Sequence, residues 1–134
     1  MRIVWKHMPL AIHKDAPAAH RASVAASKQG KFWEFHDQLF SNQQNLKPEA
    51  FRQHAQELGL DMEQFQKDQL DANNQKLIDA DMAEAQSLGV TGTPGFFVNG
   101  RFLSGAKPFA EFAKVINAEL ARLNLPVPPE AQAQ

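Results

Sequence analysis

Few side chains in this sequence can do nucleophilic chemistry, and cysteine is absent from all 134 residues. Without a thiolate, the chain supplies no sulfur nucleophile, no structural disulfide and no thiolate ligand for a metal. The serines lie in no Gly-x-Ser-x-Gly turn, which is the local signature of one large class of acyl-transfer enzymes. We therefore predict no catalytic residue in this chain.

The sequence has five histidines: His7, His13, His20, His36 and His54. Their spacing shows neither the His-x-x-x-His pattern of a helical metal site nor a matching set of carboxylates, so we expect no metal and no cofactor. We place His13 and His20 at the surface or at the edge of the core. Asp37 follows His36, but adjacent residues on a helix point about 100° apart. We therefore do not expect them to face each other as an acid–base pair.

One group of aromatic residues consists of Phe32, Trp33, Phe35 and Phe40. Such a group can line a ligand pocket or form part of a core. The three phenylalanines and Leu39 lie on one side of an amphipathic helix predicted from Lys31 to about Gln43. We interpret the group as core rather than as a pocket.

Helical patterns also cover residues 15–29, 48–58, 62–70, 77–88 and 109–123. The first is rich in alanine and ends at Gly30. Pro48 suits the first turn of the second helix, and Asp61 is positioned to cap the third. Leu70 is expected to pack inward from that third helix.

Two regions favour strands. Residues 3–5 (Ile-Val-Trp) form a short β-prone run that Pro9 interrupts. Residues 96–103 predict a hairpin whose turn is Asn99 and Gly100. The order of strand, several helices, hairpin and helix indicates an α/β or α+β domain with a small sheet.

The composition excludes several kinds of partner. Fourteen basic and 15 acidic residues give a net charge of −1 without a basic patch, so we expect no nucleic-acid partner. The sequence lacks an apolar run of about 18 residues, so we expect no membrane span, and the N-terminus does not read as a secretory signal. These observations leave the compartment open.

Four segments occur in the order found in a known family: residues 7–10, 29–40, 89–100 and 104–108. Together they resemble the DsbA-like thiol-disulfide oxidoreductases. The resemblance implies a thioredoxin fold over residues 1–124, with a helical insertion at about 13–88. We expect residues 125–134 to form a flexible tail.

The resemblance also implies a binding site. The family's proline beside the active site, which follows a cis peptide bond, matches Pro94. We therefore expect Gly92, Thr93 and Pro94 to present their backbone to an extended polypeptide. Gly92 and Gly95 leave that backbone accessible.

The sequence departs from the family at its start. The family's domain opens with a strand and a Cys-x-x-Cys helix, and neither element is present here. The run at residues 3–5 resembles the family's second core strand. We therefore predict an incomplete thioredoxin-like α/β fold, with a helical insertion and a small sheet that lacks the N-terminal βα unit.

Three ways to complete the sheet stay open: a second copy, a different chain, or an upstream part of a longer protein. They correspond to three functions. In the first, the chain is part of a disulfide oxidoreductase and is inactive alone. In the second, it is a non-redox peptide- or protein-binding module. In the third, it is a structural homodimer formed by strand exchange. Complete relatives usually act in the bacterial cell envelope.

Overall fold

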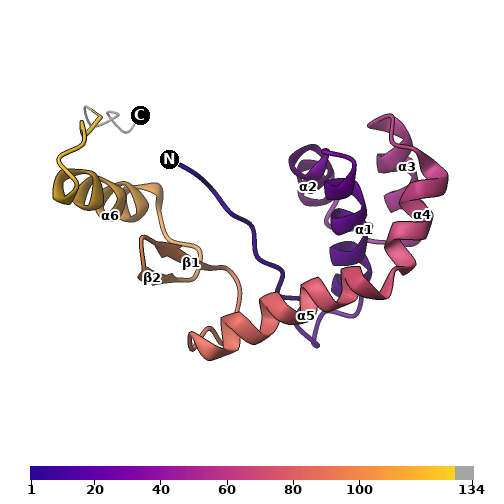
Figure 1. Cartoon of the computed structure of the whole chain (residues 1–134), viewed down its shortest axis with the longest axis horizontal. Coiled ribbons are helices and arrows are strands. Elements are labelled where there is room, and N and C mark those ends of the chain that lie inside the picture. Colours follow the sequence, from indigo (N-terminus) through magenta and orange to yellow (C-terminus); the bar gives the residue numbers. More distant parts are fainter. Residues whose placement is uncertain (129–134) are drawn as a thin grey trace. The chain divides into compact units, whose positions relative to one another are not determined.

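The computed structural model describes residues 1–128. Residues 125–128 lie outside helices and strands, and the remainder of the predicted tail, residues 129–134, lies outside the described part. The chain divides into two compact units: Met1–Gly89, here the helical unit, and the residues from Val90 onward, here the hairpin unit. Figure 1 labels the helices and strands of the two units.

The helical unit contains five helices: α1 (Ala16–Lys28), α2 (Phe32–Ser41), α3 (Pro48–Glu57), α4 (Met62–Leu70) and α5 (Ala72–Ser87). All lie close to their predicted positions, and α5 begins earlier than predicted because Asp71 caps it. The Asp71 carboxylate accepts the backbone N–H of Asn73 at 2.8 Å. The predicted cap at Asp61 is confirmed, since its carboxylate accepts the N–H of Gln64 at 2.9 Å.

Helix α1 is the centre of this unit, because it contacts each of the other four helices. Its side chains at the contacts are small, and Ala22, Ala25 and Ala26 are completely buried. Small side chains let neighbouring backbones come close, so the larger phenylalanines of the other helices can fill the remaining space. Phe35 of α2 and Phe65 of α4 meet there with ring centroids 5.8 Å apart.

The predicted strand at residues 3–5 is wrong. Residues 1–10 lie outside helices and strands, and Ile3 and Val4 are 67% and 59% exposed. A strand exists only when a neighbour pairs with its backbone, and the described residues of the helical unit include no strand to pair with. The segment instead follows α5, where the N–H of His7 is donated to the Asp81 carboxylate at 2.9 Å.

Three predictions of inward packing are also wrong. Leu70 is 86% exposed, Phe40 is 54% exposed and Trp33 is 45% exposed. Leu70 is the last residue of α4, whose buried residues are Phe65 and Asp68. Phe40 lies near the end of α2, and its ring contacts His36 and Trp5 at the surface rather than the buried cluster.

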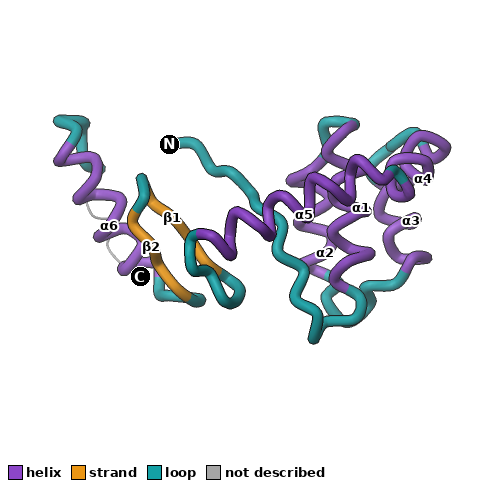
Figure 2. Tube along the Cα trace, turned by 60° about the horizontal axis from the view of Figure 1, so that its bottom comes forward, coloured by secondary structure: helices purple, strands orange, loops and turns teal. Residues whose placement is uncertain are grey.

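The hairpin unit contains β1 (Gly95–Val98), β2 (Arg101–Ser104) and α6 (Phe109–Arg122). The two strands lie side by side (Figure 2) and pair antiparallel. Phe97 is opposite Phe102. Asn99 and Gly100 have φ angles of 47° and 84°, as a tight two-residue hairpin turn requires. The predicted hairpin and its turn are confirmed.

Candidate functional site

The predicted binding loop enters β1 directly. Thr93 and Pro94 are exposed, Gly92 is half-buried, and the Thr93–Pro94 peptide bond is cis. The carbonyl of Pro94 accepts the N–H of Gly105 at 2.8 Å, which ties the loop to the residue after β2. The loop is therefore held at one end and open at its surface.

The backbone of Gly92 and Thr93 is available to a ligand. Within residues 1–128, neither residue forms a backbone hydrogen bond. A Cβ placed on Gly92 would point into open space, with nothing within 4 Å. Exposed N–H and C=O groups in an extended loop are the partners that an added strand uses.

Gly95 is constrained in a way that Gly92 is not. A Cβ at Gly95 would lie 3.1 Å from Val90 Cγ1 and 3.3 Å from Phe102 Cε2. The absence of a side chain therefore lets the start of β1 lie directly against these two residues. The lack of a side chain at Gly95 therefore allows close packing at the start of β1, whereas Gly92 borders open space.

A buried carboxylate joins the hairpin to α6. Glu119 is 4% exposed and forms an ion pair with Arg101, whose Nε lies 2.7 Å from its carboxylate. It accepts hydrogen bonds from Arg122 Nε at 2.9 Å and Asn99 Nδ2 at 3.4 Å. The hydrogen bond from Arg122, with those of its neighbours, lowers the pKa of the Glu119 carboxyl. Phe96 also packs edge-on against Phe112 of α6, with ring centroids 4.7 Å apart. These contacts orient the hairpin that follows the loop.

The hairpin has an apolar and unpaired surface. Phe96, Phe97 and Phe102 are 39%, 43% and 44% exposed. In the described residues, β1 and β2 pair only with each other, so each strand has one free edge. An exposed edge with aromatic side chains beside it is a template for pairing with another strand.

The histidines do not gather into a metal site. Across residues 1–128, no group of three or more His, Cys, Asp or Glu side chains is arranged to hold a metal ion. The expectation that His36 and Asp37 point apart is wrong, because His36 Nδ1 lies 2.9 Å from Asp37 Oδ1. Asp37 is mostly exposed, so its short side chain is free to turn toward the ring.

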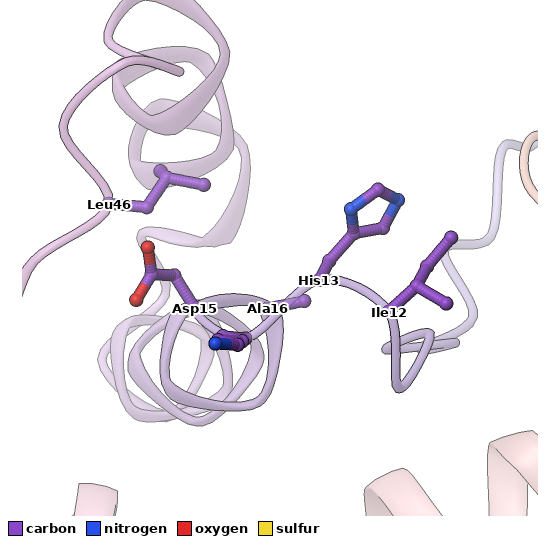
Figure 3. A pocket seen from close by; sticks show the side chains of 6 residues that line it. Ile12, His13, Asp15, Ala16 and Leu46 are labelled. Carbon is purple, nitrogen blue, oxygen red and sulfur yellow. The ribbon is translucent and has the colours of Figure 1, made fainter.

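The helical unit has two open hollows. One, of about 480 Å³, is lined by residues that include Ile12, His13, Asp15 and Leu46 (Figure 3). Asp15 already pairs there with Lys47 at 2.9 Å. The other, of about 530 Å³, lies between residues 2–7 and helices α2 and α5. Neither hollow brings together groups that could act on a substrate.

A family model supplies the decisive comparison. The DSBA-like thioredoxin domain matches residues 1–117 of the chain. The chain belongs to the DsbA-like thioredoxin family. The predicted resemblance is confirmed, and this DsbA-like domain has no cysteine.

A solved structure confirms the fold of this DsbA-like domain. It is similar to a thioredoxin-like oxidoreductase from Silicibacter pomeroyi, with 31% sequence identity and a TM-score of 0.77. The match covers 90% of this chain and 68% of the other. The predicted α/β thioredoxin-like fold with a partial sheet is therefore correct.

Curated relatives of the domain are much longer proteins. It is 41% identical over 102 residues to Na⁺/H⁺ antiporter NhaA 3 of Salinispora tropica, covering 75% of this chain and 16% of the relative. It is 38% identical over 118 residues to Na⁺/H⁺ antiporter NhaA of Herminiimonas arsenicoxydans, covering 88% and 19%. The chain thus spans less than a fifth of these relatives. No helix within residues 1–128 has both the length and the apolarity needed to cross a bilayer.

Proposed function

We propose that this DsbA-like domain binds extended polypeptide without thiol chemistry of its own. The observation that carries the proposal is the open backbone of Gly92 and Thr93, which leads into a strand with a free edge. A bound segment would add main-chain hydrogen bonds at the loop. Its apolar side chains would cover the exposed phenylalanines of the hairpin.

The absence of cysteine supports a binding role over a catalytic one. Thiol–disulfide exchange begins with attack by a thiolate, and none of the 134 residues can provide one. Any redox sulfur would have to come from another segment or another chain. Binding through backbone groups requires no such partner.

The names of the relatives support a module rather than a transporter. Those relatives are called antiporters, but the part that matches this DsbA-like domain is only 16–19% of their length. If this domain serves in a protein of that kind, we place it as an accessory part that binds polypeptide. Ion transport would then belong to the remainder.

The test is a binding titration with two labelled peptides flanked by lysines. One alternates valine and threonine, and the other has proline at every position of that alternating run. Fluorescence anisotropy should show binding of the first only, since proline removes the N–H groups that strand pairing requires. Equal binding of both peptides, or of neither, would refute the proposal.

Gly92→Ala is the sharpest variant for this test. Its methyl group projects into open space, so the fold should be unchanged. A peptide lying on the loop would meet that methyl group, and its Kd should rise about tenfold, which corresponds to about 1.4 kcal/mol. An unchanged Kd with an intact circular dichroism spectrum would place the peptide elsewhere.

A structural homodimer is the second candidate. Residues 3–5 favour it, because they are β-prone, have no strand partner within residues 1–128 and leave Ile3 and Val4 exposed. Light scattering after size-exclusion chromatography tests it directly. A mass of about twice 15.0 kDa would support the dimer, and a compact species of 15.0 kDa would exclude it.

A further inference from the structure

The N-terminal segment is attached to the helical unit through a pair of histidines. His7 Nδ1 lies 2.8 Å from His20 Nδ1 of α1, and the two rings meet edge to face with centroids 5.1 Å apart. His7 is only 6% exposed. The pair is unrelated to the loop at residues 92–94, so the inference drawn from it is independent of the proposed function.

The contact between the two Nδ1 atoms depends on how the rings are protonated. A neutral imidazole carries one proton, so one Nδ1 can donate while the other accepts. When both rings are protonated, both Nδ1 atoms are donors and the hydrogen bond cannot form. Two adjacent positive charges in a buried position then repel each other.

Other charged groups surround the pair. From α5, Asp81 accepts the backbone N–H of His7 at 2.9 Å and the ammonium of Lys6 at 2.9 Å. Lys6 also pairs with Glu84 of α5 at 2.7 Å. From α2, the neighbour is the uncharged ring of Phe32, 6.2 Å from His7. Asp81, the carboxylate that contacts His7, is thus already shared with Lys6.

Burial decides how the rings titrate. It lowers the pKa of His20 to about 4, with a further lowering from His7 that Asp81 only partly opposes. Burial likewise lowers the pKa of His7. Both rings are therefore neutral at pH 7, so one Nδ1 can donate and the other can accept in the short contact.

We propose that His7 and His20 form a pH-sensitive latch that holds residues 1–10 on α1 and α5 and releases them in acid. Release would detach the ring of Trp5 from Phe32 and His36, against which it packs with centroids 5.8 and 4.9 Å away. It would also open the hollow of about 530 Å³ that residues 2–7 help to line. The β-prone run at residues 3–5 would then be free to pair with another strand.

The test follows the backbone of residues 2–8 by ¹H–¹⁵N heteronuclear NOE, which reports motion on the picosecond to nanosecond scale. In the wild-type chain these values should fall as the pH decreases from about 6.5 to about 4, while far-UV circular dichroism keeps its helical signal. Constant NOE values across this range would overturn the proposal. So would loss of the NOE values only together with the helical signal.

His20→Asn removes the repulsion between two protonated rings and keeps a group that can hydrogen bond with His7, so the NOE values should depend much less on pH in this range. His13→Gln is the matched control, because His13 is exposed in the preceding loop and lies outside the pair. It should retain the wild-type profile. The same profile in both variants would show that another group controls the segment.

A second measurement needs no variant. Nitrogen-15 spectra of the imidazole rings at pH 7 should show a protonated Nδ1 on one ring of the pair and an unprotonated Nδ1 on the other. Protonation of the rings should coincide with the fall in the NOE values. Protonated rings at pH 7, or ring titration without any change in the segment, would contradict the latch.

Discussion

The helical unit and the hairpin unit treat their phenylalanines in opposite ways. Phe35, Phe51 and Phe65 are at most 1% exposed, whereas Phe96, Phe97 and Phe102 are between 39% and 44% exposed. Five helices around α1 can cover one another's apolar faces, but two strands and one helix leave an apolar surface open. The helical unit covers its phenylalanines with its own residues, whereas the hairpin unit leaves these three partly exposed.

Phe35→Ala should have the largest effect of the variants that test this contrast. It would remove a completely buried ring from the cluster and should lower the free energy of unfolding by about 3–5 kcal/mol. Phe97→Ala is the matched control, with an expected loss of below about 1 kcal/mol. Urea unfolding followed by circular dichroism measures both. Similar losses for the two variants would remove the distinction between a closed and an open unit.

The dependence of stability on pH sharpens the comparison within the helical unit. Histidines with lowered pKa values favour the neutral folded form, so the unfolded chain binds more protons once the pH drops below about 6.5. The free energy of unfolding should therefore fall by about 2 kcal/mol between pH 6.5 and 4. Urea midpoints measured at each pH report this fall.

Carboxylates contribute to the free energy of unfolding in a separate pH range. The backbone N–H of Asn73 and other contacts lower the pKa of Asp71, so its contribution is present above about pH 4 and is lost only below it. A midpoint that stays constant down to pH 4 would mean that the buried histidines are already charged or that solvent reaches them.

His54→Leu tests a defect in the closed unit. His54 is 6% exposed, and neither ring nitrogen has a hydrogen-bond partner in the described structure. Leucine removes two unsatisfied polar atoms at similar volume, so the free energy of unfolding should rise by about 1–2 kcal/mol. The thermal midpoint measures the gain. A decrease would show that a water or another group satisfies the ring in solution.

Gly95→Ala probes the hairpin unit with the smallest expected effect. Its methyl group would press on Val90 and Phe102, costing about 1 kcal/mol through local adjustment. Amide hydrogen exchange in β1 and β2 should become about fivefold faster, while exchange in α1 stays unchanged. Gly92→Ala should change neither. An equal acceleration in α1 would show that the two units unfold together.

Local rules predicted much of the fold. The Asn99-Gly100 turn, the Asp61 cap and the alanine-rich α1 each follow from a few adjacent residues. The prediction of a strand at residues 3–5 was wrong because strand pairing depends on a partner that the local sequence does not specify. The prediction that Phe40 is buried was wrong because helical spacing shows which residues share a face but not where the neighbouring helix ends.

The candidate site shows the same limit. The loop at Gly92–Pro94 could be singled out because four ordered segments resemble one family, and what it binds is still a prediction. The His7–His20 contact had no signal in the sequence, since it joins an irregular segment to a helix 13 residues away. Such a contact arises only when tertiary packing fixes the path of the chain.

The alanines of α1 also set how freely this domain can vary. A side chain at Ala22, Ala25 or Ala26 has no exposed surface, and the helix that carries it contacts four others. A larger residue there would displace backbones rather than fill space. Natural variants of the domain should therefore keep small residues along this stripe, even where the hairpin phenylalanines differ, because the former set the distances between helices and the latter only cover a surface.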